Sequence, residues 1–348
     1  MPRRTLASQL LVLALLGAAL LAVSVAAIGI GDVAIGWREA IAILLDGPPA
    51  DAPGGAAPVS PHVAIIWRLR LPRILLAILV GGALAAAGMT MQALFQNPLA
   101  DPYLVGVAPG AAVGATAALV LGLGAGRLGA HALPLAAFAG SLVVSLLVYI
   151  LASRFGRVPV LHLLLFGIAI GAFCTGLTSF LLLISPQHVQ EVYFWLLGSF
   201  QNARWAAVRT VWPYLLAGTL LLFFFAREMD VLLLGEEQAQ SLGVAVERLK
   251  RILLAASTLL AAVAVAVGGI IGFVGLIVPH MMRLLVGPRH RVLLPASVLG
   301  GAALLVVSDT LARSLRPATE IPVGIVTTFL GVPFFLYLLT RKRIGAGG

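Results

Sequence analysis

The chain has 348 residues, of which 61% are hydrophobic and only 10% charged, and its net charge is +10. A soluble globular protein has about 45–50% apolar and about 25% charged residues, so this composition excludes a water-soluble fold. The charge pattern argues against nucleic-acid binding, because the Arg residues lie in twos and threes between apolar runs and form no basic patch. Such residues instead indicate loops that stay in the cytoplasm.

The first apolar run begins near Ser8 and ends near Ile28, after Arg3 and Arg4. It is long enough to span a bilayer, which takes about 20 residues, whereas the apolar part of a signal peptide has about 7–15. We therefore expect a retained first membrane helix.

The uncharged apolar stretches predict an all-α fold of ten transmembrane helices. They lie at residues 8–29, 74–95, 103–122, 130–152, 160–184, 210–226, 252–270, 271–285, 292–308 and 321–340. Gly268, Gly269 and Gly272 allow the chain to turn between the seventh and the eighth. A single kinked helix over 252–285 would give nine helices instead.

The distribution of charge favours ten helices over nine. With ten, and with the N-terminus inside, fourteen of the 23 Lys and Arg residues lie in cytoplasmic loops. With nine, the last three basic residues would lie outside. The fourteen are Arg3, Arg4, Arg154, Arg157, Arg227, Arg248, Lys250, Arg251, Arg283, Arg289, Arg291, Arg341, Lys342 and Arg343.

Two stretches between the apolar runs stand out. Residues 46–61 are rich in Pro, Gly and Ala without periodicity, which predicts a flexible loop on the outer face. Residues 227–250 form the longest charged stretch and fall on the cytoplasmic side. Within it, Gly235 and Gly243 bracket good helix formers, which predicts a helix of about two turns.

Motifs for catalysis or metal binding are absent from the sequence. It has no P-loop for ATP, no H-E-x-x-H motif and no Cys/His cluster at zinc spacing. We interpret Cys174 and the six scattered histidines as structural, with His188 the one to watch because it lies in an outer-face loop. Asp309 is expected to pair with Arg313, four residues further along the same helix.

Several stretches, in order, resemble the iron-chelate and cobalamin permease family of ABC importers, and the resemblance covers Trp67 to Arg343. They are LRLPR at 69–73, GGALA at 81–85, MQALFQNPLADP at 91–102, GVAPGA at 106–111, LGEEQAQSLG at 234–243, GFVGLIVPH at 272–280, RVLLP at 291–295 and EIPVG at 320–324 after Asp309 and Arg313.

The resemblance implies a type II ABC importer permease fold, with residues 1–348 as a single transmembrane permease domain and 227–250 as its cytoplasmic coupling segment. It implies a homodimer in the bacterial inner membrane, with the pathway at the dimer axis. The charge distribution over ten helices places both termini in the cytoplasm. Two ATPase subunits would bind ATP and Mg, so this chain itself would hold no cofactor and would not be an enzyme. A binding protein outside the membrane would deliver an iron-siderophore, haem or cobalamin, and the sequence does not decide which.

The resemblance also assigns roles to three groups of residues. Asn97, Pro98 and Leu99 look like a cytoplasmic gate, opposed by the loop at about Ser153 to Pro159; the simpler interpretation is a helix cap and turn. The coupling helix that docks on the ATPase would comprise Gly235, Glu236, Glu237, Gln238, Ser241, Leu242 and Gly243, where the simpler alternative is a solvated charged loop.

The third group is expected on the outer side of the membrane. Arg70, Arg73 and Arg313 would receive acidic residues of the binding protein, since Arg forms bidentate pairs with carboxylates. Anchoring at lipid headgroups is the alternative. Nearby aromatic residues predict an interfacial belt, with a lining of the outer vestibule as the alternative. They are Tyr193, Phe194, Trp195, Phe200 and Trp205.

Three other classes of protein fit the composition less well. A secondary carrier would need titratable or sodium-binding residues within the membrane, and no charged residue falls deep in any of the ten segments. A membrane-embedded enzyme would need a catalytic cluster near the interface. A structural membrane protein would not need the ordered matches.

Overall fold

The computed structural model of the chain describes residues 6–31, 33–48, 60–125, 129–154, 160–315 and 320–344, and this part of the chain is helical with no strand. Most of the predicted loop at 46–61 lies outside the described residues. The α-helices are α1 (Leu6–Gly29), α2 (Trp37–Asp46), α3 (Pro61–Ala64), α4 (Leu71–Leu94), α5 (Val107–Val120), α6 (Ala132–Ser153), α7 (Val160–Ile184), α8 (Val189–Leu196), α9 (Trp205–Phe224), α10 (Ala226–Leu232), α11 (Glu236–Ser241), α12 (Val246–Gly268), α13 (Val274–Val286), α14 (His290–Ser314) and α15 (Val323–Ile344).

Shorter helical turns connect some of these helices. A π-helical turn, η1 (Ile65–Arg70), leads directly into α4, and a 3₁₀ turn, η2 (Pro102–Val105), precedes α5. Further 3₁₀ turns are η3 (Leu123–Ala125), η4 (Gly129–His131) and η5 (Pro186–His188).

Seven helical stretches of the described chain are long and apolar enough to cross a membrane. They are Ala7–Gly29, Pro61–Leu94, Gly129–Ser153, Val160–Ile184, Trp205–Phe224, Val246–Gly268 and His290–Ser314. Three shorter apolar helices, Val107–Val120, Val274–Val286 and Val323–Tyr337, occupy the other predicted segments. The all-α membrane fold is thereby confirmed, while the number of crossings stays a prediction.

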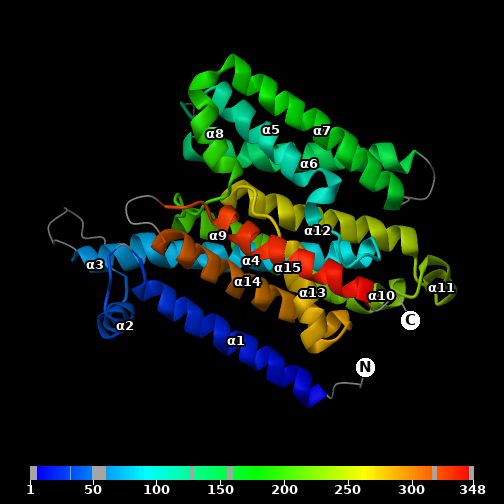
Figure 1. Ribbon diagram of the computed structural model, residues 1–348, viewed down its shortest axis with the longest axis horizontal. Helices are drawn as coiled ribbons and strands as arrows, with labels where there is room; N and C mark the ends of the chain where they lie inside the picture. Colours follow the sequence, from blue (N-terminus) through cyan, green and yellow to red (C-terminus); the bar gives the residue numbers. More distant parts are fainter. Residues whose placement is uncertain are drawn as a thin grey trace.

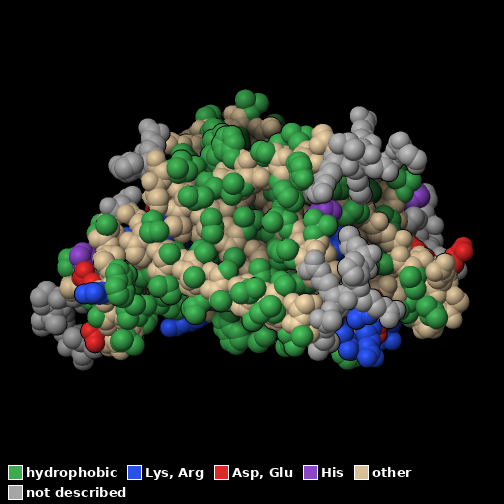
Figure 2. Space-filling view, turned by 60° about the horizontal axis from the view of Figure 1, so that its bottom comes forward, with side chains coloured by type: hydrophobic (Ala, Val, Ile, Leu, Met, Phe, Trp, Pro, Cys, Tyr) green, Lys and Arg blue, Asp and Glu red, His purple; other side chains and the backbone are tan. Residues whose placement is uncertain are grey.

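The long helices run roughly along one axis of the molecule (Figure 1). At one end, which we call the α11 end, lie α10, α11, the start of α1 and the end of α15. At the other, the α3 end, lie α2 and α3. Figure 2 shows hydrophobic side chains across the middle of one face, with charged side chains gathered toward both ends. That distribution suits an apolar band between two polar surfaces.

Helix boundaries differ from the prediction where charged residues continue a helix into the polar region. Helix α12 begins at Val246 rather than at 252, because the preceding VERLKR stretch contains good helix formers. Helix α9 begins at Trp205 rather than at 210. The single kinked helix over 252–285 does not form, since Gly269–Phe273 is non-helical and separates α12 from α13.

Helix α4 is the centre of the packing, buried against α14, α12, α13 and α9. Two glycine pairs permit this close approach. A Cβ atom at Gly81 would overlap the carbonyl oxygen of Gly301 on α14, and one at Gly88 would overlap that of Gly275 on α13. Small residues at such crossings bring backbones together, which is how apolar helices gain packing energy in lipid.

We predict that Gly88→Ala destabilises the protein by about 1–3 kcal/mol, because the added methyl group has no space and α13 must move away. Gly17→Ala on α1 is the matched control, since nothing lies within 4 Å of a Cβ atom there. Thermal unfolding in detergent would measure both. Equal melting temperatures for the two variants would show that the α4–α13 crossing is not tightly packed.

Candidate functional site

Helix α4 ends in a tight turn that carries the predicted gate residues. The N–H of Asn97 donates to the carbonyl of Gln92 at 3.1 Å, and the N–H of Gln96 donates to that of Ala93 at 3.2 Å. This pair of bonds is a Schellman motif, whose left-handed position is normally glycine. In this chain that position is Gln96, with φ at +47°.

Asn97, Pro98 and Leu99 form the next turn, directly after this helix end. The Asn97 side-chain oxygen accepts the N–H of Leu99 at 3.0 Å, and its carbonyl accepts that of Ala100 at 3.1 Å. Asn97 is exposed, and Pro98 and Leu99 are half-buried. The turn is therefore ordered by its own side chain and presents Asn97 at the surface. Residues 155–159 of the predicted opposing gate lie outside the described residues.

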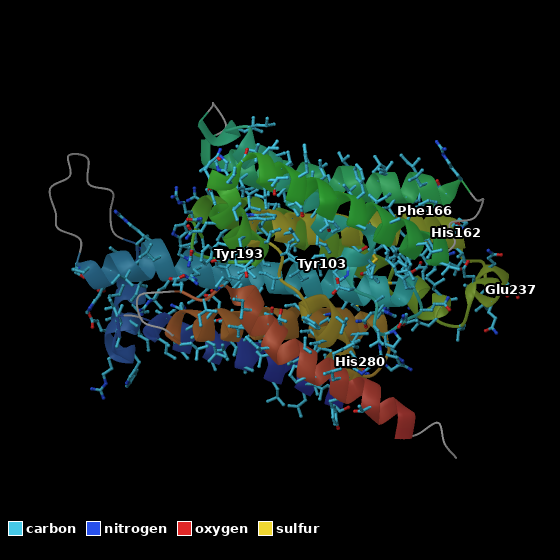
Figure 3. All side chains as sticks on the ribbon, turned by 45° about the horizontal axis from the view of Figure 1, so that its top comes forward. Tyr103, His162, Phe166, Tyr193, Glu237 and His280 are labelled. Carbon is cyan, nitrogen blue, oxygen red and sulfur yellow. The ribbon has the colours of Figure 1, made fainter. Side chains whose placement is uncertain are left out.

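Beside this turn lies a surface hollow of about 280 Å³. One Asp101 carboxylate oxygen accepts the N–H of Tyr103 at 2.8 Å and so caps η2. The Tyr103 hydroxyl, central in Figure 3, donates to the carbonyl of Ile271. The hollow is lined by Asp101, Tyr103, Leu104, Pro109, Gly167, Ile168 and Gly171.

The short helix predicted between Gly235 and Gly243 is present as α11. Gly235 precedes it with φ at +109°, and Gly243 follows with φ at +85°, conformations that favour glycine. Ala239 is fully buried, whereas Leu242 is 64% exposed. Glu237 lies at the extreme α11 end of the molecule (Figure 3). The other exposed residues of this element are Gln238, Gln240, Ser241 and Gly243.

Ion pairs join this segment to the neighbouring helices. Glu236 contacts the buried Lys250 on α12 at 2.6 Å, and Lys250 also contacts Glu247 at 3.4 Å. On α10, one oxygen of Asp230 contacts both the backbone N–H and Nδ1 of His290 at the start of α14, at 2.8 and 2.7 Å. Glu236 is therefore bound within the chain, while its exposed neighbour Glu237 points outward.

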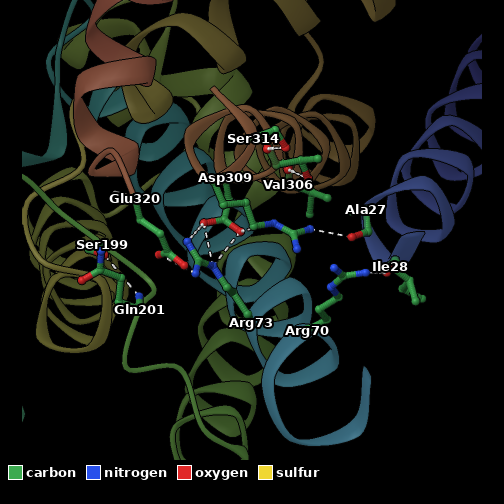
Figure 4. Close-up of polar contacts among 12 residues, drawn as sticks. Ala27, Ile28, Arg70, Arg73, Ser199, Gln201, Val306, Asp309, Ser314 and Glu320 are labelled. Carbon is green, nitrogen blue, oxygen red and sulfur yellow. Dashed lines mark hydrogen bonds and ion pairs between the residues drawn. The ribbon is translucent and has the colours of Figure 1, made fainter. Parts of the chain in front are cut away.

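At the α3 end, buried charges tie α4 to α14 (Figure 4). Nε and Nη2 of Arg73 donate to the Asp309 carboxylate at 2.9–3.0 Å, and Nη1 donates to Glu320 at 2.8 Å. Arg73 and Asp309 are 8% and 1% exposed. The predicted contact of Asp309 with Arg313 is present at 3.7 Å, without a hydrogen bond. Arg73 was not predicted as the partner of Asp309, because the two residues lie 236 positions apart in the sequence.

The two other predicted docking arginines also have partners within the chain. Arg70 donates to the carbonyls of Ile28 and Val33, and Arg313 donates to that of Ala27. Both side chains are buried, at 5% and 6% exposure. The C-terminal end of α1 carries a partial negative charge, so two cationic side chains beside its last carbonyls are electrostatically favourable. Exposed arginines at the α3 end of the molecule include Arg38 and Arg68.

Aromatic residues near α8 divide into two groups that differ in exposure, and the predicted belt stays a prediction. Tyr193 and Phe194 are exposed, with Tyr193 visible toward the α3 end in Figure 3. Phe200 is 1% exposed, and Trp205 donates its Nε1–H to the carbonyl of Trp67. The last two are core contacts, because they fill the junction where the chain enters α9.

Histidines form no metal cluster in the described part of the chain. His162 on α7 and His280 on α13 lie on separate helices (Figure 3). His62 contacts Glu39 at 2.6 Å, and His188 lies 3.8 Å from Glu191. Cys174 is buried on α7.

Comparisons with known proteins consistently indicate one family. The profile of the FecCD transport family matches residues 14–341. The chain is 48% identical to the cobalamin import system permease protein BtuC of Halobacterium salinarum, covering 81% of this chain and 75% of that protein. It is 44% identical to the hemin transport system permease protein HmuU of Yersinia pestis, covering 80% and 84%.

A solved structure gives the same result for the fold. It is described as an inward-facing conformation of a metal-chelate type ABC transporter, and it is similar with a TM-score of 0.80 at 31% identity. The similarity covers 96% of this chain and 99% of that one.

We predict that Arg73→Met or Asp309→Leu alone lowers the free energy of unfolding by about 3–5 kcal/mol, because each leaves a buried charge without its main partner. The double variant should cost less than the sum of the two, since the residues are in direct contact. Arg68→Met, at an exposed site in η1, is the control. Thermal unfolding in detergent measures all four, and strict additivity would contradict the coupling.

Proposed function

The chain belongs to the FecCD transport family and is the membrane-spanning permease subunit of an ABC importer, and we propose that it imports a metal chelate as half of a homodimer driven by two ATPase subunits. The ATPase subunits bind ATP and Mg, and this chain supplies the pathway. It lies in the inner membrane of a bacterium with both termini in the cytoplasm.

The observation that carries this proposal is the exposed face of α11. A six-residue helix held between two glycines presents Glu237, Ser241 and Leu242 at one end of the molecule. Exposed apolar side chains rimmed by polar ones are typical of a protein contact. Leu233 and Leu234, 40% and 56% exposed, extend the same surface. This surface receives the ATPase subunit.

The orientation of the chain follows from its basic residues. Arg227, Arg248 and Arg251 are on α10 and α12 near the α11 end, and Arg289 and Arg291 lie at the start of α14. Since Lys and Arg mark cytoplasmic loops, the α11 end faces the cytoplasm. The helices α1 and α15 begin and end there, which supports cytoplasmic termini.

The homodimer axis runs along α7 in this proposal. Helix α7 is only 22% buried over its most apolar window, so most of its surface needs either lipid or another subunit. The hollow with Asp101 opens beside it, between η2 and Gly167. The Asp101 carboxylate in this hollow is better placed against protein or a water-filled path than against lipid. A second copy facing α7 would enclose that path.

Transport follows alternating access, with the turn at Asn97–Leu99 as the gate at the cytoplasmic end. A binding protein delivers the chelate at the α3 end. Direct docking on Arg70, Arg73 and Arg313 would require their buried intramolecular contacts to open. Of the two acids that bind Arg73, Glu320 is the more accessible, with its side chain 32% exposed against 2% for Asp309. Exposed Arg38 and Arg68 can receive carboxylates without such a change.

The cargo is a cobalamin, haem or iron-siderophore complex, on the strength of relatives named for cobalamin and hemin. We expect the dimer, co-reconstituted with its ATPase subunits and binding protein in liposomes, to accumulate one of ⁵⁷Co-cyanocobalamin, ⁵⁵Fe-haemin or a ⁵⁵Fe-hydroxamate siderophore only with ATP–Mg. Accumulation by the permease alone, or no ATP-dependent uptake of any of the three, would refute this assignment.

We expect Glu237→Arg to reduce co-purification of the ATPase subunit by at least about ten-fold, because it reverses an exposed charge in the centre of the proposed contact. Glu191→Arg, also at an exposed acid but on α8, is the matched control. Undiminished co-purification of the Glu237→Arg variant would place the ATPase elsewhere. Glu236 is unsuitable for this test, since its loss would also remove an ion pair of the buried Lys250.

A further inference from the structure

Gln96 occupies a backbone position that is unfavourable for it. Its φ of +47° places it in the left-handed region at the end of α4, and in the described chain only Phe273 is another non-glycine residue with positive φ. Glycine adopts this conformation without steric cost and is the usual residue at this position of a Schellman motif. Non-glycine residues held there mark sites where the side chain has a use.

The use is visible in one long-range contact. The side-chain amide of Gln96 donates from Nε2 to the carbonyl oxygen of Leu232 at 3.1 Å, across 136 residues of sequence. The same carbonyl accepts the N–H of Gly235 at 3.1 Å. Gly235 is the N-cap of α11, so one oxygen atom is bonded both to the end of α4 and to the start of α11.

We propose that Gln96 is a positioning residue that transmits movement of α11 to the turn at Asn97–Leu99. The inference rests on the proposed function, in which α11 receives the ATPase and this turn is the gate. Leu232 is fully buried at the end of α10, so a displacement of α11 that shifts its carbonyl pulls on the Gln96 amide. Asn97 follows Gln96 directly, and therefore the shift reaches the gate turn through one peptide bond.

The Glu236–Lys250 ion pair and the Asp230–His290 contact do not provide this link. They join the coupling segment to α12 and α14, not to the end of α4. The Gln92 amide binds the carbonyl of Leu276 at 3.0 Å, and this contact joins α4 to α13 rather than to α10. The Gln96 bond differs from all three because it connects the end of α4 directly to the residues that lead into α11.

Three substitutions distinguish a role of Gln96 in transmitting movement of α11 from a role in stabilising the fold. Gln96→Glu has the same length but replaces the donor by a carboxylate that cannot donate to Leu232. Gln96→Gly removes the side chain and relieves the unfavourable φ, so the protein should unfold at the same or a higher temperature. Gln96→Lys restores a donor of sufficient reach and is the rescue variant.

The readout is the gate turn itself and needs no cargo. In a Cys174→Ala background, Leu99→Cys is labelled with a water-soluble maleimide in the full complex with its ATPase subunits, nucleotide-free and trapped with ATP and vanadate. With Gln96 present, the labelling rates in the two states should differ. In the Glu and Gly variants we expect this difference to shrink about five-fold, as for the loss of one typical hydrogen bond, and the Lys variant to recover it.

An undiminished difference in both the Glu and the Gly variants would overturn the role of Gln96 while leaving the proposed function intact. If the chain with Gln96 itself shows no difference although ATP is hydrolysed, the gate assignment fails, and the inference fails with it. A Gly variant that unfolds at a lower temperature would also contradict the inference, because the side chain would then be needed for stability.

Discussion

Close approach of backbones around α4 is the constraint on which this structure depends. Apolar side chains gain little from leaving lipid for a protein interior, so helices in a membrane associate through close packing and polar contacts. The pairs Gly81–Gly301 and Gly88–Gly275 leave no space for even one methyl group, and they bring α14 and α13 directly against α4. The positions of the turn at Asn97–Leu99, of η2 and of the charged cluster at the α3 end all follow from where α4 lies.

The two ends of α4 are held by bonds of very different strength. At the α3 end, Arg73 makes charge-assisted bonds to Asp309 and Glu320 in a buried site, and such bonds are roughly twice as strong as neutral ones. At the α11 end, α4 is joined to α10 by the neutral, partly exposed bond of Gln96 to Leu232. This asymmetry favours a fixed α3 end and a movable α11 end of α4.

The sequence was sufficient to predict the helical membrane fold, the family and the short glycine-bounded helix α11, because these depend on local composition and short motifs. It could not predict that Arg73 binds Asp309, since the i, i+4 spacing pointed to Arg313 instead and tertiary contacts carry no local signal. The burial of Phe200 and the hydrogen bond of Trp205 to Trp67 could not be predicted for the same reason. The amphipathic helix α2 was missed because its ten residues are too few to span a bilayer, and length sufficient to span was the criterion by which the helices were predicted.

Helix α1 shows how the chain has to be assembled. It packs chiefly on α14, its Gln9 side chain binds the carbonyl of Val286, and its last turn is bound by Arg313. These partners are synthesised long after α1 leaves the ribosome, as the sequence separations of 277 and 286 residues indicate. Helix α1 must therefore wait in the bilayer until nearly all of the chain that follows it has been made, and a prematurely terminated product would leave the α14-facing side of α1 without its partners.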